Sequence, residues 1–334
     1  MLRLFLAVDA GGTSTRCVAV DEYGGCHGYG RSASGNPISA GPALAARSVA
    51  EAAGQALRQA NAAGGESGPR VASVLLAMAG ASALSGTELF AAELAPLGVS
   101  APVAFAPDLL ATFCSGTWRL DGYALVAGTG ATAVRVEGGE VACTADGLGW
   151  LLGDEGSGFW IGERVARAAV TDLDRRGPQT ALTELLLAEL GLTADDTLYQ
   201  GRPAVLQHLV ETLYALRPVQ LAQFARLAFD AARAGDAVAA RIVRDAADAL
   251  AHTLATVDDA QVDGPVVLGG GTVAQHDELV ARIGDARTSG GLPREVRVVA
   301  DGVVGAAVIA LRQASVAVDE QVFARIVDTL ATLR

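Results

Sequence analysis

The sequence contains no lysine, and all 25 of its lysine-or-arginine positions hold arginine. This absence excludes mechanisms that need a lysine side chain, such as Schiff-base catalysis and the phosphate-binding lysine of P-loop enzymes and protein kinases. If the chain binds phosphate, the negative charge of the phosphate must be offset by a metal ion, backbone N–H groups and helix N-termini.

Cysteine is scarce as well, and the four present form no Cys-x-x-Cys pair: Cys17, Cys26, Cys114 and Cys143. Because the chain also has only four histidines, we expect no zinc site of the usual kind. We expect the cysteines to be free thiols in a reducing cytosol. No apolar run is long enough to span a membrane, and the run at the N-terminus ends at Asp9, too early for a signal sequence. We therefore expect a soluble, cytoplasmic protein with no membrane partner.

Positive charge is outweighed by negative charge. The formal net charge is -12 and the isoelectric point is near 4.8, which argues against binding to nucleic acid or to an anionic membrane. Hydrophobic residues make up 51% of the chain and charged residues 19%, a balance that predicts a large core. The 334 residues exceed the ~250–300 at which single cores split, so two domains are expected.

Apolar periodicity and turn residues predict the order βββαβαβα in the first part of the chain. The predicted strands cover residues 4–8, 15–20, 27–32, 71–80 and 101–108, and the predicted helices cover 41–65, 86–97 and a segment that begins after Asp108.

The second part of the chain repeats this plan with a helical insertion. A strand–turn–strand–turn–strand pattern covers 123–144, and a helix-rich stretch follows at roughly 158–256. Two further strand–helix units cover 265–275 and 295–313. We expect an N-terminal lobe over residues 1–118 and a C-terminal lobe over 119–318. A last helix, within 319–334, is expected to pack back on the N-terminal lobe.

Two glycine-rich turns occupy equivalent places in these halves, DAGGTST (9–15) and AGTGAT (127–132). Each places glycine N–H groups beside a hydroxyl residue directly after an apolar strand, an arrangement that can bind an anion without a cationic side chain. Either turn alone can be a tight hairpin turn that binds no ligand, but the pair predicts a two-sided clamp for a polyphosphate. A third cluster, GGG (269–271), stands between strand and helix, where a nucleotide can approach the backbone closely.

The chain resembles the N-acetylglucosamine kinase branch of the BadF/BadG/BcrA/BcrD ATPase family, within the acetate kinase–sugar kinase–Hsp70–actin superfamily. The matching segments lie in the family's order and span nearly the whole chain: DAGGTST (9–15), SGNP (34–37), PD (107–108), AGTGAT (127–132), GLGWLLGDEGSGFWIG (147–162) and GGG (269–271). The resemblance implies an α/β fold of two duplicated actin-like, ribonuclease H-like lobes, with the active site in the cleft between them.

For the nucleotide, the resemblance implies ATP and Mg²⁺ as cofactors. Asp9 would hold the Mg²⁺ of MgATP, mainly through water. On the first hairpin, the implied phosphate contacts are Gly11, Gly12 and Thr13. On the second hairpin they are Thr129 and Gly130. Gly270 and Gly271 would border the adenosine.

For the second substrate, the resemblance implies an amino sugar. Asn36 and Asp154 would bind sugar hydroxyls, and Gly147 and Leu148 would lie near the 2-substituent. Asp108 would contact the sugar and accept the proton of its 6-hydroxyl as the phosphoryl group transfers, which is the role of a general base.

Each of these polar residues has a structural alternative. Asp108 can cap the helix that follows it, and Asn36 before a proline can be a turn residue. Asp154 can stabilise the first turn of the helix that starts near Ser157 through the helix dipole.

One departure from the family's pattern concerns the acyl group. Relatives that favour N-acetylglucosamine often carry Gly-Gly-Trp-Gly where this chain has Asp146-Gly147-Leu148-Gly149. Leu148 suits an acetyl methyl group, whereas Asp146 suits a free 2-ammonium group. We expect an N-acetylglucosamine 6-kinase that forms a homodimer. The alternatives are a glucosamine 6-kinase and, from another class in the family, an ATPase that activates a partner enzyme.

Overall fold

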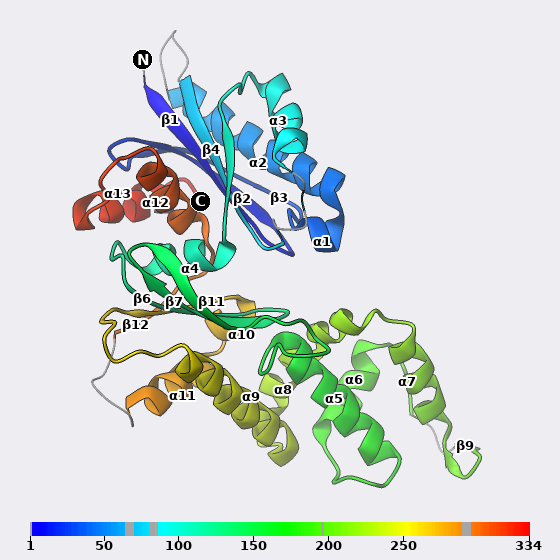
Figure 1. The fold of residues 1–334 in the computed structure, drawn as a ribbon. Helices are drawn as coiled ribbons and strands as arrows, with labels where there is room; N and C mark the ends of the chain where they lie inside the picture. The colour runs from blue at the N-terminus through cyan, green and yellow to red at the C-terminus, as the bar shows by residue number, and fades with distance from the viewer. Residues whose placement is uncertain (1, 64–69, 81–83, 85, 195–196, 289–294) are drawn as a thin grey trace.

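Two five-stranded sheets with the same strand order form the frame of the molecule, described here from a computed structural model (Figure 1). The structure describes all residues except 1, 64–69, 81–83, 85, 195–196 and 289–294. The order is β3-β2-β1-β4-β5 in the first sheet and β8-β7-β6-β11-β12 in the second. In each sheet the first three strands of the chain are antiparallel and the last two run parallel to the first. The predicted duplication is therefore confirmed.

The first sheet and its helices follow the predicted order. Their bounds are β1 (Arg3–Ala10), β2 (Thr15–Asp21), β3 (Cys26–Ser32), α1 (Pro37–Ala40), α2 (Pro42–Ala63), β4 (Arg70–Met78), α3 (Glu88–Leu94), η2 (Ala95–Leu97), β5 (Val103–Ala106) and α4 (Asp108–Gly116). Pro42 suits the first position of α2, where no N–H is needed. The predicted end of that helix, at residues 64–65, lies outside the described residues.

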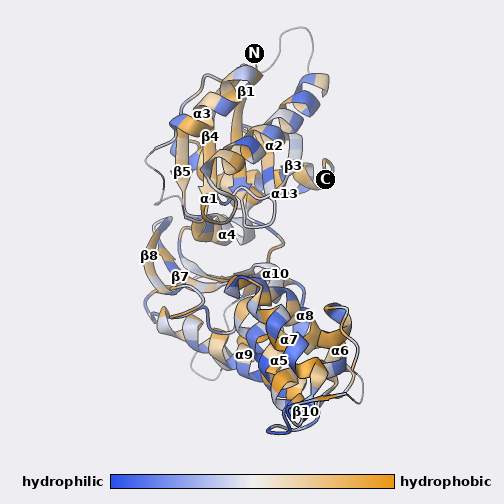
Figure 2. Cartoon of the chain, turned by 90° about the vertical axis from the view of Figure 1, so that its right-hand side faces the viewer, coloured by the Kyte–Doolittle hydropathy of each residue, from blue (hydrophilic) through white to orange (hydrophobic). Residues whose placement is uncertain are grey.

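The second sheet carries the predicted helical insertion. Its elements are β6 (Gly122–Ala127), β7 (Ala131–Glu137), β8 (Glu140–Asp146), α5 (Gly158–Leu173), α6 (Ala181–Glu189), β9 (Leu198–Tyr199), β10 (Arg202–Pro203), α7 (Ala204–Tyr214), η3 (Pro218–Phe224), α8 (Ala225–Arg233), α9 (Ala237–Thr256), β11 (Val266–Gly269), α10 (Gly271–Ala274), α11 (Asp277–Thr288), β12 (Val296–Val298), α12 (Val303–Gln313) and α13 (Glu320–Ala331). Helix α9 packs on β6, β7 and β8, on the face of this sheet that is turned away from the first lobe, and α5 and α8 pack against α9 (Figure 2).

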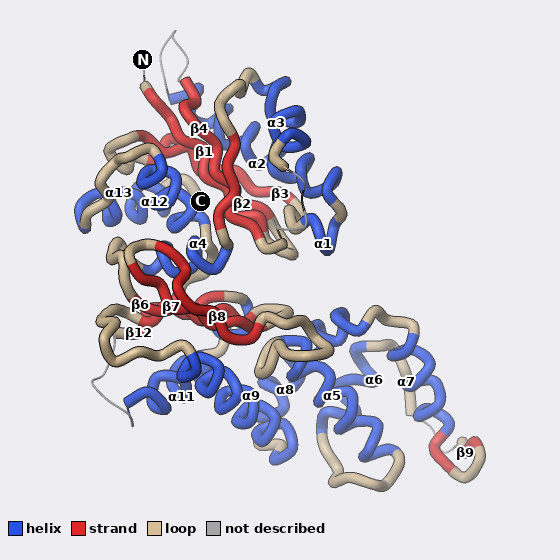
Figure 3. The backbone as a smooth tube through the Cα atoms, viewed as in Figure 1, coloured by secondary structure: helices blue, strands red, loops and turns tan. Residues whose placement is uncertain are grey.

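The space between the sheets is filled by one helix from each half of the chain (Figure 3). Helix α4 follows a strand of the first sheet but packs on β6 and β11 of the second. Helix α12 follows the second sheet but packs on β1 and β4 of the first. Both helices share one apolar core with the inner faces of both sheets, including Phe5, Phe113 and Val267. Each sheet therefore buries its inner face against a helix that belongs, in sequence, to the other half.

Helices α4 and α12 cross in direct backbone contact. A Cβ atom on Gly305 would lie 1.8 Å from the carbonyl oxygen of Ala111, so only glycine fits there. The Gly305 N–H donates a 2.8 Å hydrogen bond to Ser115 Oγ on the facing helix. The crossing is thus fixed by both shape and a buried polar contact.

The terminal helix α13 lies on the first lobe. It packs beside β3, and the N–H of Cys26 donates to Thr329 Oγ1 at 2.9 Å. The division of the chain at residues 118 and 318 stays a prediction, since α12 lies within 119–318 and packs on the first sheet. In the part of the chain that the structure describes, no helix has the length and apolar character needed to cross a bilayer.

Gly305→Ala should lower the free energy of unfolding by about 2–3 kcal/mol, because the added methyl group forces the two helices apart. Gly284 on α11 is the matched control, since no atom lies within 4 Å of the Cβ it lacks. Gly284→Ala should be neutral or stabilise by about 0.5–1 kcal/mol. Urea unfolding of both variants makes the comparison, and equal stabilities would contradict the close crossing.

Candidate active site

Asp9 stands at the end of β1, on the face that looks toward the second lobe. Side chains alternate along a strand, and Phe5 and Ala7 of the same face lie in the core between the sheets. Asp9 is the next residue of β1 on this face after Phe5 and Ala7. Its Oδ2 accepts a 2.9 Å hydrogen bond from the N–H of Gly302, directly before α12. The first strand of the chain thus meets the start of the helix that the second lobe sends back.

Arg16 supplies the positive charge beside Asp9. It is the cross-strand neighbour of Asp9 on β2, with its Nη1 3.5 Å from Asp9 Oδ2 and its Nε 3.3 Å from Asp301 Oδ2. Sequence reasoning missed Arg16, Asp301 and Gly302. The signals were an arginine just past the first glycine turn and an Asp-Gly pair before a predicted helix, but neither is specific alone.

Burial raises the pKa of Asp9 from 3.8 to about 6. The hydrogen bond from Gly302 opposes this shift, Asp301 adds to it by repulsion and Arg16 opposes it by attraction. A smaller repulsion comes from Asp108. Because β1, β4 and β5 are parallel in one sheet, Asp9 and Asp108 lie where strands end at the same edge of that sheet.

Asp108 is the first residue of α4, and the N-cap position is held by Pro107. The capping alternative thus falls on the wrong residue, although the Asp108 carboxylate still receives backbone N–H groups, including that of Leu109. Burial raises the pKa of Asp108 above its usual value, and these N–H groups oppose the shift. An ionised carboxylate with a raised pKa is a better proton acceptor than one with the usual value.

The residues around Asp9 fit a magnesium ion that a nucleotide brings with it. Mg²⁺ prefers oxygen ligands and usually keeps several waters, binding one or two carboxylates besides phosphate oxygens. Asp9, Asp108 and Asp301 provide such oxygens, but among the described residues no three acidic, histidine or cysteine side chains form a metal-binding group. That Asp9 holds the ion mainly through water stays a prediction.

The first glycine hairpin has a free tip and an anchored base. The N–H of Gly11 donates to Ser14 O at 3.0 Å, and the N–H of Gly35 donates to Gly11 O at 3.1 Å. Gly12 and Thr13 at the tip are exposed. The base is thus joined to the SGNP segment, while the tip leaves its backbone open to a ligand.

The second hairpin rests on the start of α5. The N–H groups of Gly158 and Phe159 donate to the carbonyl oxygens of Gly128 and Thr129, at 2.8 and 3.1 Å. Thr272 Oγ1 donates to the same Gly128 oxygen at 2.9 Å. These bonds consume the carbonyl groups of the turn, and the Thr129 side chain remains exposed.

The triple glycine lies directly beside this hairpin. Gly270 has φ 88°, and a Cβ there would lie 2.5 Å from Ala127 O at the end of β6. A larger residue is excluded on both counts. Gly271 then begins α10, with its nitrogen 3.9 Å from the Cβ position of Gly128. The residues predicted to border adenosine are therefore adjacent to the second predicted phosphate-binding hairpin.

Asp154 points at the second hairpin instead of capping α5. Its Oδ1 accepts the N–H of Ala131, next to Gly130, at 3.1 Å, whereas Ser157 caps the helix that starts at Gly158. Burial raises the pKa of Asp154, and the Ala131 hydrogen bond opposes this. The first-turn alternative is not what the structure has, because Asp154 precedes the helix with φ 58°.

Asp146 anchors the same loop. Its Oδ1 accepts the N–H of Asp154 at 2.7 Å and its Oδ2 the N–H of Glu155 at 3.0 Å. Gly147 then donates its N–H to Ala131 O at 3.0 Å. Because both carboxylate oxygens of Asp146 hold backbone groups, the structure disfavours its use as the binder of a sugar ammonium group.

The last two predicted sugar residues differ in their surroundings. Asn36 Oδ1 accepts the N–H of Ile38 at 2.8 Å, so the turn role of Asn36 is present, and its sugar contact stays a prediction. Leu148 is 67% exposed at the start of a loop that also exposes two further leucines, Leu151 and Leu152.

Comparison with known proteins places this arrangement. The sequence model of the BadF/BadG/BcrA/BcrD ATPase family matches residues 6–310. The chain belongs to this family. An N-acetyl-D-glucosamine kinase from Dictyostelium discoideum is 29% identical over 290 residues, which cover 83% of this chain and 87% of that protein. A glucosamine kinase from Vibrio cholerae is 26% identical over 248 residues, or 74% and 77% of the two chains.

A solved structure from Chromobacterium violaceum, assigned as an N-acetylglucosamine kinase, has the same fold as this family member. The two superpose with a TM-score of 0.68 at 24% identity, over 93% of this chain and 99% of that one. The expected two-lobed α/β fold is thereby confirmed.

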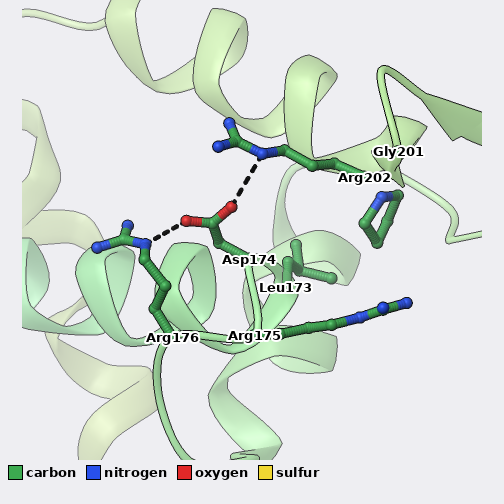
Figure 4. Close-up of a pocket in the computed structure, with 7 residues that line it drawn as sticks. Leu173, Asp174, Arg175, Arg176, Gly201 and Arg202 are labelled. Atoms are coloured by element: carbon green, nitrogen blue, oxygen red, sulfur yellow. Dashed lines mark hydrogen bonds and ion pairs between the residues drawn. The ribbon is translucent and has the colours of Figure 1, made fainter.

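Two hollows lie on the second lobe of this family member. One of about 640 Å³ is bordered by Trp150, Leu151 and Gly153 of the 147–153 loop and by α5 and η3. The other, of about 230 Å³, lies in the insertion, where Asp174 forms ion pairs with Arg176 and Arg202 and Arg175 points away from them (Figure 4). Neither contains a predicted site residue.

Asp9→Asn should stabilise the metal-free protein at neutral pH. The pKa of Asp9 is 3.8 unfolded and about 6 folded, so ionisation of this carboxyl favours the unfolded chain. The resulting penalty is fully present above pH 6 and disappears as the pH falls toward 4. We expect a gain of about 1–3 kcal/mol at pH 7.5 that shrinks at pH 4.5. Urea unfolding in EDTA at both values tests this, and a less stable variant at pH 7.5 would refute it.

Proposed function

We propose that this family member is an ATP-dependent amino-sugar kinase that phosphorylates the 6-hydroxyl of N-acetylglucosamine. The observation that carries the proposal is that Asp9 and Asp108 lie at the same edge of the first sheet, where the parallel strands β1 and β5 end, and that the N–H before α12 binds Asp9. Phosphoryl transfer to an alcohol requires both a carboxylate for the metal ion and a carboxylate that acts as base. The relatives named above support the substrate class.

In this proposal each group at the site has one task. Asp9 holds the hydrated Mg²⁺ of MgATP, which offsets charge on the phosphates. Asp108 accepts the proton of the sugar 6-hydroxyl. The backbone groups that meet the phosphates and adenosine are those of Gly11, Gly12, Thr13, Thr129, Gly130, Gly270 and Gly271.

The helix termini supply the charge that lysine would give elsewhere. Helix α12 starts directly after the Gly302 N–H that binds Asp9, α4 starts at Asp108, and a helix N-terminus carries a partial positive charge. Arg16 adds the guanidinium group closest to this point on β2. A site that lacks lysine can therefore still stabilise the transferred phosphoryl group.

For the sugar, we propose that Asn36 and Asp154 bind hydroxyl groups and that Gly147 and Leu148 border the 2-substituent. The apolar side chain of Leu148 and the occupied carboxylate of Asp146 favour an acetamide over an ammonium group. The Vibrio cholerae relative supports glucosamine as the second candidate.

An ATPase that activates a partner is less well supported. Such a protein needs cysteines at an interface to bridge an iron–sulfur cluster. Cys17, Cys26 and Cys114 are buried, and Cys143 lies within β8 against the core of the second lobe. The described cysteines therefore offer no such surface.

We also propose a homodimer and a cytoplasmic location. The exposed apolar side chains of Leu151 and Leu152, at 73 and 77%, support a self-association surface. The buried free cysteines are in keeping with a reducing compartment. Light scattering coupled to size-exclusion chromatography decides the first point.

The decisive experiment measures ADP release with Mg²⁺ over a panel of hexoses, 2-amino-hexoses and N-acyl amino sugars. We expect saturable release with N-acetylglucosamine and the 6-phosphate as product. ATP hydrolysis that no sugar stimulates would overturn the proposal in favour of the activator class.

Asp108→Asn should lower turnover by ~10²–10⁴-fold while binding of MgADP and of sugar is retained. The amide keeps the size of the side chain and one acceptor for the N–H groups at the start of α4, but it accepts no proton. Steady-state kinetics with calorimetric titration of both ligands separates these effects. Near-normal turnover would reduce Asp108 to a helix-terminal residue.

Asp146→Ala should lower kcat/KM for N-acetylglucosamine and glucosamine alike, by about tenfold. The variant removes the two hydrogen bonds from the N–H groups of Asp154 and Glu155 to a carboxylate, and a hydrogen bond to a charged group contributes about 1.5–3 kcal/mol. Asp146→Asn keeps one acceptor oxygen, so its kcat/KM should fall between those of the unaltered protein and Asp146→Ala. If glucosamine activity alone were lost, the ammonium interpretation would be restored.

A further inference from the structure

Asp301 is held by two guanidinium groups that come from different elements. Arg16 Nε on β2 lies 3.3 Å from its Oδ2, and Arg334 Nη2, beyond the end of α13, lies 2.8 Å from its Oδ1. The Asp301 side chain is 7% exposed, against 21% for Arg16 and 35% for Arg334. A carboxylate this buried needs such partners, because desolvation of an unpaired charge is costly.

Asp301 also sits where the chain crosses from one lobe to the other. The N–H of Val299 still bonds to Leu268 O of the second sheet, at 2.9 Å, whereas the N–H of Gly302 already bonds to Asp9 of the first. Only two residues separate these anchors. Fixing Asp301 therefore fixes the segment that delivers the Gly302 N–H to Asp9.

Arg334 is itself well positioned for this task. Its guanidinium carbon lies 5.6 Å from the centre of the Tyr29 ring on β3, a cation–π distance. Tyr29 lies on the first sheet two residues before Arg31, the cross-strand neighbour of Arg16. A continuous chain of contacts thus runs from Tyr29 through Arg334, Asp301 and Arg16 to Asp9.

We propose that Arg334 is a positioning residue of the nucleotide site: by fixing Asp301 it holds Arg16 and the Gly302 N–H in place around Asp9. The inference rests on the proposed role of Asp9 in binding the nucleotide's metal ion. It adds the segment that follows α13, which carries no predicted site residue, to the parts of the fold on which nucleotide binding depends.

Two physical effects follow from removing the Arg334 side chain. Asp301 then draws Arg16 toward itself and away from Asp9, and the crossing segment loses one of its anchors. The cluster also becomes more negative, which repels a nucleotide. Asp301→Asn separates these effects, because it removes the anchor while making the cluster less negative.

Calorimetric titration of MgADP, together with KM and kcat for MgATP, tests the proposal. Arg334→Ala should raise the dissociation constant of MgADP by about three- to tenfold, with kcat changed less than twofold. Arg334→Lys should restore most of the loss. Asp301→Asn should also weaken binding, whereas a purely electrostatic effect predicts tighter binding.

Arg325→Ala is the matched control on α13. Its guanidinium Nη1 donates a hydrogen bond to Tyr23 O, at 3.3 Å, on the exposed surface. Circular dichroism should show every variant folded at the titration temperature. If Arg334→Ala and Arg325→Ala bind MgADP equally well, or if Asp301→Asn binds it more tightly, the proposal is overturned. If MgADP binding behaves as expected but no sugar is phosphorylated, only the proposed substrate fails.

Discussion

The hydrogen bond from the Gly302 N–H to Asp9 is the contact on which the candidate site depends. It joins the first strand of the chain to the start of α12 and so brings a helix N-terminus to a buried carboxylate. Arg16 and Asp301 complete the cluster, and Asp108 approaches it from α4. The chemistry of the site is therefore assembled from both halves of the chain and exists only while the halves are docked.

The absence of lysine gives this cluster its character. A lysine-based site can carry its charge on a long, solvated side chain, whereas here the charge of a bound phosphate must be met by groups fixed in the backbone. Helix starts and glycine N–H groups cannot follow a ligand that moves, so their positions must be set by packing. This explains why so many hydrogen bonds at the site, such as those of Asp146 and Asp154, serve to hold loops.

Much of the fold was predictable because it repeats. Glycine turns at equivalent places and strands at equivalent spacing indicated two copies of one unit, and both sheets have that order. Asp9 and Asp108 were predicted because the motifs that contain them, DAGGTST and PD, resemble those of the family. Arg16 and Asp301 were not, because their importance comes from a meeting of distant segments. Likewise Asp146 looked like a free charge, since sequence does not reveal which backbone N–H groups a carboxylate accepts.

The exchange of α4 and α12 between the sheets also bears on how the chain matures during synthesis. When the first sheet leaves the ribosome, its inner apolar face has no partner, because α12 is made only after the whole second sheet and the insertion. That face must stay exposed, or be covered by a chaperone, for most of translation. The docking of α12 then closes the core and brings the Gly302 N–H to Asp9 in the same step.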